Sequence, residues 1–255
     1  MTGSGTGIVW ITGAGSGIGR ALALRYLRAG AVVAGTARRA ETLASLEAEA
    51  SVGGSRFHAL PADLTDLAAT RAVVARIEAD IGPIRLAVLN AGTYMPTPGS
   101  RFHADTVRQL LDSNVMTAAN ALDAVLPAML ARQHGMVAIN ASLAGYGGLP
   151  SAAAYGASKA ALINMAEALK LDLASRGIAV RLVSPGFIKT PLTDRNTFPM
   201  PFLMPVEEAA ERLWQALETG SSFEIVFPRR FAWLMKALNL LPYRLYFPLV
   251  SRMTR

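Results

Sequence analysis

The chain of 255 residues is long enough for one large α/β domain, and its composition, 52% hydrophobic and 17% charged, excludes an intrinsically disordered protein. It has no cysteine, which excludes disulfides and thiol catalysis, and its histidines at positions 58, 103 and 134 lack ligand-like spacing, so we predict no metal site. The net charge of +7 is concentrated in residues 226–255, which hold six basic and no acidic residues, and this argues against a nucleic-acid-binding body.

The first residues do not show a basic region followed by an apolar one, and no uninterrupted apolar run reaches the roughly 18 residues of a membrane-spanning helix. We therefore expect a cytoplasmic protein. Seven short apolar runs then alternate with helix-length segments. The expected strands are Gly7–Thr12, Ala31–Thr36, Arg56–Leu60, Leu86–Asn90, Met136–Asn140, Ala179–Ser184 and Phe223–Phe227.

Continuous apolar strands separated by helices predict a parallel sheet with both faces covered and right-handed crossovers, which is a doubly wound α/β fold. We predict a single catalytic domain over residues 1–228. Within it, residues 187–205 are rich in proline and apolar side chains and are expected to form a lid. Residues 229–255 form a C-terminal apolar, basic tail beyond the last core strand.

The first expected strand runs into a glycine-rich turn, and a helix is expected over Arg20–Leu27. Glycine tolerates positive φ, and a pyrophosphate approaches the backbone closely only where no Cβ stands, at the positive end of a helix dipole. Gly13, Gly17 and Gly19 meet these needs. The G-x-G-x-x-G pattern is not matched in any register, so the turn by itself indicates either a dinucleotide site or a plain tight turn.

Further motifs follow the turn in a fixed order. They are Thr12-Gly-x-x-x-Gly-x-Gly19, Asn90-Ala91-Gly92, Ser142, Tyr155-x-x-x-Lys159 and Pro185-Gly186. With this combination the chain resembles the short-chain dehydrogenase/reductase family over roughly residues 7–228. The resemblance implies a seven-stranded Rossmann-like sheet, a nicotinamide cofactor and hydride transfer at an alcohol or carbonyl carbon. It implies cofactor contacts from Gly13, Ser16, Gly17, Ile18, Gly19, Asp63, Leu64, Asn90, Ala91, Gly92, Tyr155, Lys159, Pro185, Gly186, Ile188 and Thr190.

The end of the second expected strand bears on the choice between NAD and NADP. An acidic residue there accepts hydrogen bonds from the ribose 2′-hydroxyl and would repel a 2′-phosphate. Here Ala37 removes that repulsion, while Arg38 offers a planar fork for phosphate and Arg39 adds positive charge. The alternative is that both arginines are solvated charges at a helix start. We predict NADP(H), with Arg38 and Arg39 as its phosphate ligands.

Tyr155 and Lys159 are four residues apart on an expected helix over Ser151–Arg176, so their side chains share one face. A neighbouring ammonium stabilises a phenolate, so we predict a lowered pKa for Tyr155, which would suit it as general acid or base. The family resemblance adds that Lys159 binds the nicotinamide ribose, that Ser142 holds the substrate oxygen and that Asn114 supports a proton-relay water. The alternative is a catalytically inactive NADP-binding scaffold or sensor.

The lid bears on the substrate, because its residues include Phe187, Phe198, Phe202 and Met204. With Tyr94, Met95, Leu143, Tyr146 and Leu149 expected near the opening, the site favours an apolar ketone or aldehyde, lipid-, steroid- or aromatic-like. The same residues could instead pack the lid onto the body or onto a second subunit. By resemblance we expect a homodimer or homotetramer paired through helices over Ala104–Gln133 and Ser151–Arg176.

The tail combines apolar and basic residues. A helix is expected over Phe231–Leu241, ended by Pro242. Trp233, Tyr243 and Tyr246 are typical of interfacial anchors, and the basic residues could meet anionic lipid headgroups. Three interpretations stay open: peripheral attachment to the inner face of the membrane, a cover over a neighbouring subunit or the pocket mouth, or an unordered tail. The basic residues in question are Arg229, Arg230, Arg244, Arg252 and Arg255.

Overall fold

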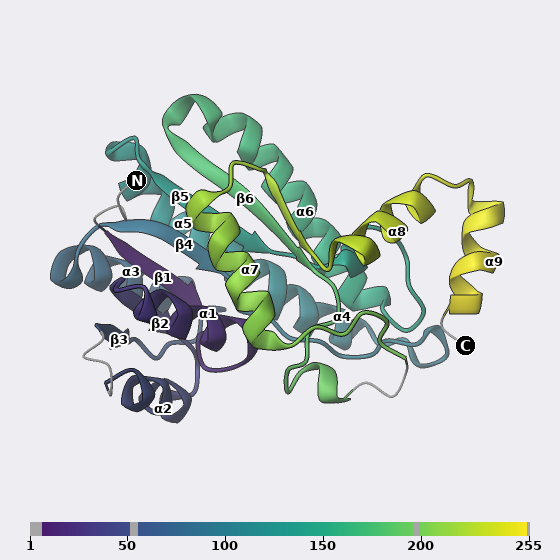
Figure 1. Ribbon diagram of the computed structural model, residues 1–255, viewed down its shortest axis with the longest axis horizontal. Coiled ribbons are helices and arrows are strands. Elements are labelled where there is room, and N and C mark those ends of the chain that lie inside the picture. The colour runs from purple at the N-terminus through teal and green to yellow at the C-terminus, as the bar shows by residue number, and fades with distance from the viewer. Residues whose placement is uncertain (1–6, 52–55, 196–198, 254–255) are drawn as a thin grey trace.

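The computed structural model describes residues 7–51, 56–195 and 199–253 (Figure 1). Its centre is a seven-stranded parallel sheet in the order β3-β2-β1-β4-β5-β6-β7, which confirms the predicted doubly wound α/β fold. Each strand begins and ends within two residues of its expected bounds. The strands are β1 (Ile8–Thr12), β2 (Val33–Thr36), β3 (Phe57–Ala59), β4 (Ile84–Leu89), β5 (Gly135–Asn140), β6 (Ile178–Pro185) and β7 (Glu224–Phe227).

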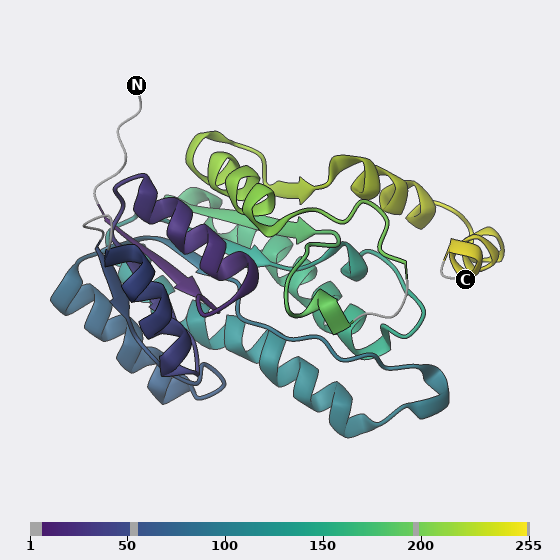
Figure 2. The same cartoon turned by 60° about the horizontal axis from the view of Figure 1, so that its bottom comes forward.

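Helices cover both faces of the sheet, and each face has its own apolar core. One core packs α1 (Gly17–Arg28), α2 (Ala40–Ser51) and α7 (Val206–Thr219) on the sheet, and α1 and α7 lie side by side (Figure 2). The other core packs α3 (Leu67–Arg76), α5 (Thr117–Ala131) and α6 (Ala153–Leu173). Strands buried on both faces explain why their sequences are continuous apolar runs.

The helix expected over Ala104–Gln133 is interrupted by a π-helical turn. It consists of α4 (Ala104–Leu110), the turn η3 (Leu111–Met116) and α5. Among the described residues, the stretch Ala104–Ala131 is long and apolar enough to cross a membrane by length and composition, which we did not expect from the sequence. A core helix passes the same test, and α5 packs its apolar face against α3 and β4.

The order in which strands are added to the sheet reverses between β1 and β4. The strands β2 and β3 lie on one side of β1, whereas β4 to β7 extend the sheet on its other side. In open parallel sheets, ligands bind outside the carboxyl ends of the strands at such a switch point. The glycine turn after β1 and the loop after β4 meet there. Short helical turns complete the body: η1 (Ile77–Ile81), η2 (Gly99–Arg101), η4 (Leu143–Gly145), η5 (Ala174–Arg176) and η6 (Thr193–Arg195).

The tail folds onto the body as two helices, where one was expected. The first, α8 (Arg229–Asn239), begins and ends two residues before its predicted bounds, and α9 (Tyr243–Met253) was not predicted. A third apolar cluster joins the two helices to residues beside the site. Its buried members are Leu143, Phe231, Ala232, Met235, Leu238, Tyr246 and Val250. The inner face of the tail therefore packs on the body of its own chain, next to the site, while Arg255 lies outside the described residues. Attachment to a membrane and contact with a second subunit stay predictions.

Candidate active site

A cleft of about 690 Å³ opens at the carboxyl ends of the strands, along the switch point. Its walls come from the turn after β1, the ends of β2, β4 and β5, the start of α6 and the segment after β6. All of the predicted site residues line it except two, Gly19 and Asn114, which lie behind the wall. The three residues 196–198 of the expected lid, Phe198 among them, lie outside the described part of the chain.

The glycine turn at the start of α1 allows a ligand to approach its main chain closely. Gly13 and Gly17 have φ of +68° and +54°, in the left-handed region that other residues avoid. Gly19 has a different task, because a Cβ there would lie 2.3 Å from the main-chain oxygen of Gly13. Gly19 therefore allows α1 to pack closely on the turn, and its contact with the cofactor stays a prediction. The cradle left by Gly13 and Gly17, at the positive end of α1, suits a pyrophosphate.

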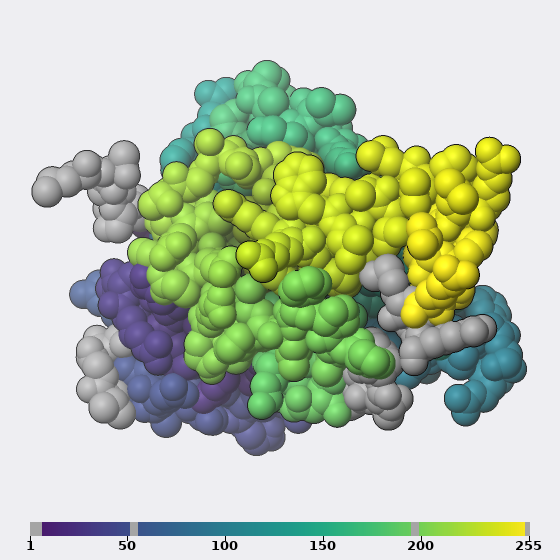
Figure 3. All heavy atoms as spheres, turned by 45° about the vertical axis from the view of Figure 1, so that its right-hand side comes forward, coloured from purple at the N-terminus to yellow at the C-terminus, as the bar shows by residue number. Residues whose placement is uncertain are grey.

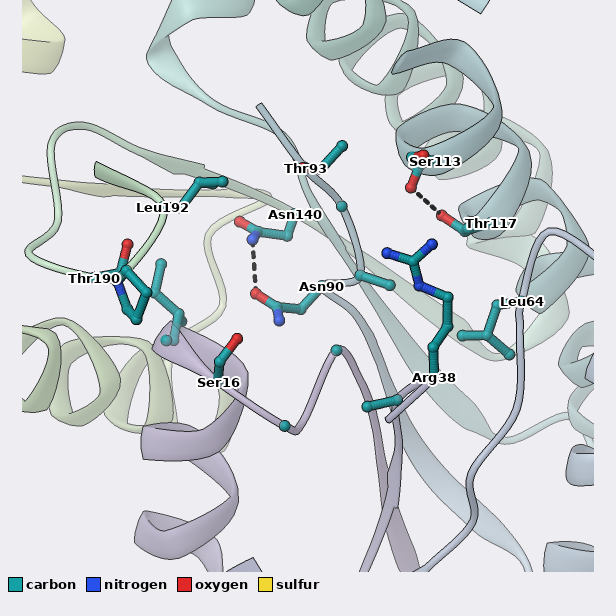
Figure 4. Close-up of a pocket in the computed structure, with 18 of the residues that line it drawn as sticks. Ser16, Arg38, Leu64, Asn90, Thr93, Ser113, Thr117, Asn140, Thr190 and Leu192 are labelled. Carbon is teal, nitrogen blue, oxygen red and sulfur yellow. Dashed lines mark hydrogen bonds between the residues drawn. The ribbon is translucent and has the colours of Figure 1, made fainter. Parts of the chain in front are cut away.

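Polar groups join β1, β4 and β5 at the floor of the cleft. The Thr12 hydroxyl accepts hydrogen bonds from the main-chain N–H groups of Asn90 (2.9 Å) and Ala91 (3.0 Å). The side-chain amide of Asn140 donates to Asn90 Oδ1 at 2.8 Å, as Figure 4 shows. Lys159 Nζ then donates to the main-chain oxygen of Asn140 at 2.9 Å. These hydrogen bonds form one connected network that holds both the loop after β4 and Lys159 in place.

The far end of the cleft is positively charged. Arg38 and Arg39 follow β2 with exposed side chains, and Figure 4 shows Arg38 extending into the cleft. Among the residues that the structure describes, neither arginine has an ion-pair partner within 4.0 Å. Asp63 lies nearby, but its Oδ1 is engaged by the N–H and hydroxyl of Thr65, and these bonds, together with Arg38, lower its pKa. The arginines are thus available to an anion.

The near end of the cleft brings Ser142, Tyr155 and Lys159 together. Tyr155 is half-buried on the cleft wall, Lys159 is buried below it, and Lys159 Nζ lies 5.7 Å from the centroid of the Tyr155 ring. Ser142 Oγ accepts from the N–H of Ala144 at 3.1 Å and hydrogen-bonds the Tyr155 side chain. The ring of Tyr94 meets the ring of Tyr155 edge-on at 5.1 Å.

The predicted lowering of the Tyr155 pKa is wrong for this arrangement. Burial raises the pKa of Tyr155 to about 12, and the hydrogen bond with Ser142 opposes this only in part. Burial also lowers the pKa of Lys159 to about 8. The ammonium donates a hydrogen bond to the main-chain oxygen of Asn140, and the net shift of the Tyr155 pKa stays upward. At neutral pH Tyr155 is therefore a protonated phenol, which can donate a proton to a developing alkoxide.

Asn114 acts through its contacts rather than at the cleft surface. Its side chain is fully buried, donates to the main-chain oxygen of Thr93 (3.0 Å) and to Ser158 Oγ (2.9 Å), and accepts from the Thr93 N–H (2.7 Å). A Cβ on Gly92 would lie 2.9 Å from Asn114 Oδ1 and 3.7 Å from Lys159 Nζ. The amide thus ties the loop after β4 to α6, beside the lysine.

The residues expected at the substrate opening separate into two groups. Tyr94 contacts Tyr155, and Met95 is half-buried in the same loop. Leu143, Tyr146 and Leu149 pack into the cluster under α8 and α9, so for these three the packing alternative is the observed one. The tail therefore packs behind residues at the substrate end, and none of its described residues lines the cleft.

Sequence analysis missed two residues of the site, Thr12 and Asn140. Thr12 was noticed only as part of the glycine motif, although its hydroxyl holds the loop after β4. Asn140 was assigned only to the end of its strand, although it contacts both Asn90 and Lys159. A polar side chain at the carboxyl end of a buried strand is a signal that could have found it.

Comparisons with known proteins agree with this geometry. A family model described as short chain dehydrogenase matches residues 7–198. An uncharacterized oxidoreductase of Myxococcus xanthus is 39% identical over 236 residues, 92% of this chain and 93% of the relative. A 3-oxoacyl-[acyl-carrier-protein] reductase of Escherichia coli is 33% identical over 186 residues, 73% of this chain and 75% of the relative.

Solved structures share the fold over most of the chain. A short-chain dehydrogenase from Streptomyces avermitilis superposes with a TM-score of 0.80 at 28% identity, covering 91% of this chain and 92% of that one. A short-chain dehydrogenase from Sphingobium yanoikuyae, in complex with NADPH, gives a TM-score of 0.79 at 28% identity, with coverages of 91% and 93%.

Proposed function

This chain belongs to the short-chain dehydrogenase family, and we propose that it is an NADP(H)-dependent oxidoreductase that reduces an apolar ketone or aldehyde, lipid-, steroid- or aromatic-like. The observation that carries the proposal is the protonated, half-buried phenol of Tyr155, hydrogen-bonded to Ser142 at the end of a dinucleotide-sized cleft. A general acid placed beside a carbonyl oxygen needs to hold its proton until charge develops on that oxygen.

Each residue then has a defined task. A bound nicotinamide cofactor supplies or accepts the hydride at this end of the cleft. Ser142 and Tyr155 hydrogen-bond the substrate oxygen, and Tyr155 donates its proton to that oxygen during reduction or accepts one in the reverse direction. Lys159, held by Asn140, places a positive charge beneath the phenol and stabilises the phenolate that remains. Asn114 is a positioning residue, because it fixes Thr93 and Ser158.

The free arginines support NADP over NAD. The position that would hold a carboxylate for NAD is Ala37, and the exposed Arg38 and Arg39 stand beside it without ion-pair partners in the described chain. The Sphingobium structure, which resembles this chain, was solved with NADPH. Gly13 and Gly17 would receive the pyrophosphate, and the lid residues Ile188 and Thr190 line the cleft, with Thr190 beside Gly17.

Apolar side chains of the lid support an apolar substrate, because Ile188 and Leu192 line the cleft and Phe187 packs behind them against the tail. Phe187 stacks on Phe231 of α8 at 5.5 Å between ring centroids, and the main chains of Phe187 and Met204 pair at the two ends of the lid. Such walls discriminate by buried apolar area and offer few partners to a polyhydroxylated or phosphorylated substrate. We also propose the reductive direction, since the phenol is protonated at neutral pH.

We further propose a cytoplasmic homodimer or homotetramer, as members of this family are commonly oligomeric. An apolar groove on α4 and η3 supports it, with Phe102, Leu111 and Met116 among its exposed walls. The small exposed side chains of α6, such as Ala157 and Ala160, allow close helix packing with a second copy.

A panel of carbonyl compounds tests the proposal directly. Pure protein is supplied with NADPH and offered long-chain, steroid-like and aromatic ketones beside sugars, and NADPH consumption is recorded. We expect turnover on the apolar compounds and its loss in Tyr155→Phe, with NADPH binding retained. Activity on polyhydroxylated substrates alone would refute the apolar pocket. Cofactor binding without turnover on any compound would support the inactive scaffold instead.

A further inference from the structure

The outer surface of α8 and α9 is apolar and basic, and we call it the tail face. Figure 3 shows these two helices, in yellow, as a ridge at one end of the molecule. Its apolar side chains are strongly exposed, up to 87% for Leu240. They are Trp233, Leu240, Tyr243, Leu245, Phe247 and Leu249. Exposed arginines lie among them, at positions 229, 230, 244 and 252.

The spacing in α8 puts apolar residues on two faces of one helix. Phe231, Met235 and Leu238 face the body and are buried. Trp233 and Leu240 lie seven residues apart on the opposite face, with Trp233 72% exposed. A surface helix ordinarily presents polar side chains on its outer face. An apolar outer face of this size marks a binding surface.

The charges on the tail face define the partner. Residues 226–255 contain no carboxylate side chain, and within the described part of this segment only Lys236 is neutralised, by Glu224 of β7. A second copy of the chain docked face to face would bring like-charged arginines together, because a two-fold interface places the same residues opposite one another. The partner that fits has negatively charged groups at its surface and an apolar interior below them. An anionic lipid membrane has this arrangement.

We propose that α8 and α9 dock the protein on the surface of an anionic membrane. Each helix has 11 residues, far below the roughly 20 needed to span a bilayer, so the helices lie in the interface. Trp233 and Tyr243 are the residue types that anchor at the headgroup level. The stacked rings of Tyr243 and Phe247, 5.4 Å between centroids, form a compact wedge beside Arg244.

This orientation has a consequence for the substrate. The inner face of α8 carries Phe231, which stacks on Phe187, and Cβ of an alanine at Gly186, a residue of the cleft wall, would lie 3.0 Å from the Phe231 ring. Docking by the outer face of α8 therefore places the lipid one helix away from the wall at the substrate end of the cleft. The supply of a lipid-soluble substrate by this route rests on the proposed function, whereas membrane binding itself does not.

Vesicle co-sedimentation of the full-length protein tests the proposal. The probes are vesicles of phosphatidylcholine alone and vesicles with phosphatidylglycerol added. We expect binding to the anionic vesicles, at least tenfold stronger than to neutral ones. Arg244→Gln combined with Arg252→Gln weakens binding, roughly fivefold for each arginine removed. Trp233→Ser combined with Leu240→Ser weakens it further, and neither pair alters thermal unfolding, because all four side chains point away from the core.

Matched substitutions elsewhere serve as controls. Arg76→Gln with Arg108→Gln removes two exposed arginines of the body, and Leu171→Ser removes an apolar side chain that is 79% exposed on α6. Both are expected to bind vesicles as the unaltered chain does. Absence of binding to anionic vesicles overturns the proposal. The proposal is also overturned if the unaltered chain does not bind lipid and its oligomer dissociates in the Trp233→Ser, Leu240→Ser variant. That result would assign the tail face to contact with a second copy.

Turnover of a water-soluble ketone with NADPH, measured without vesicles on the same samples, reports on the proposed function separately. A chain that binds vesicles but reduces no carbonyl compound contradicts the proposed function alone. A chain that reduces the ketone but ignores anionic vesicles contradicts only the membrane proposal.

Discussion

Lys159 Nζ donates a hydrogen bond to the main-chain oxygen of Asn140 at 2.9 Å, below the ring of Tyr155. The lysine is 5% exposed, and burial lowers its pKa to about 8, whereas an unfolded chain gives lysine a pKa near 10.4. A charged Lys159 is therefore unfavourable for folding at neutral pH. In the proposed mechanism, this charge stabilises the phenolate left by Tyr155.

Lys159→Met is predicted to stabilise the cofactor-free protein at pH 7 while abolishing turnover. Removing the buried charge gains more free energy of unfolding than the lost hydrogen bond contributes, for a net of roughly 1–3 kcal/mol. The melting temperature should rise by about 2–4 °C for each kcal/mol. Thermal unfolding measured beside Lys170→Met, an exposed lysine of the same helix, checks this.

The stability that Lys159→Met adds to the folded protein should become smaller as pH rises. Between pH 8 and the unfolded pKa, the unfolded chain binds a proton at Lys159 that the folded chain has lost, so the unaltered protein gains stability with pH. Below pH 8 the full difference between the variant and the unaltered chain is present. A melting temperature lowered at pH 7, or a difference that grows toward pH 9.5, contradicts the assignment of an unfavourable buried charge.

The pH dependence of reduction should follow Lys159 and not Tyr155. Burial raises the pKa of Tyr155 to about 12, so the phenol keeps its proton throughout the working range. Lys159 loses its charge above about pH 8. The reductive kcat/KM is expected to be level from about pH 6 to 7.5 and to fall up to tenfold per pH unit above 8. A fall on the acidic side of neutrality would point to a different proton donor.

The sequence predicted most of the sheet and the cleft, for physical reasons. Strands buried on both faces must be continuous apolar runs, and a close backbone approach at the turn requires glycine, so both leave a readable pattern. The contact of Lys159 with the main-chain oxygen of Asn140 leaves no such pattern, because any residue at position 140 would supply that oxygen. The upward shift of the Tyr155 pKa could not be predicted, because it depends on burial by segments distant in sequence, such as the loop with Tyr94.

The tail shows the same limit. The largely apolar stretch Phe231–Leu241 predicted α8, whereas α9 was missed because Pro242 and Pro248 break the pattern of a helix. Which face of α8 the body covers could not be read from a sequence that is apolar on two sides. Only the packing of Phe231 against Phe187 decides it.

Arg38→Ala is predicted to weaken NADPH selectively. The side chain reaches into the cleft without an ion-pair partner in the described chain, so its loss removes a charge-assisted hydrogen bond to a 2′-phosphate and leaves the apo fold intact. The KM for NADPH should rise about 10- to 100-fold with that for NADH nearly unchanged. Steady-state kinetics with both cofactors, with Arg76→Ala as the control, measures this. Equal effects on the two cofactors would sink the phosphate assignment.

Phe231→Ala is predicted to separate large substrates from small ones. The ring is 6% exposed, stacks on Phe187 at 5.5 Å and lies 6.1 Å from the ring of Phe202, so it joins α8 to both ends of the lid. Truncating a buried phenylalanine costs about 3–5 kcal/mol of stability, and the lid loses its support on that side.

The KM for a bulky apolar ketone should then rise at least tenfold, while kcat/KM for a small water-soluble ketone and NADPH affinity change little, because Tyr155 and Arg38 are not in contact with this ring. Phe231→Leu keeps an apolar filler and is expected to preserve most of the affinity for the bulky ketone. Equal losses on both ketones in the alanine variant would show that Phe231 supports the fold as a whole. A selective loss, restored by leucine, assigns the tail helix a part in substrate choice.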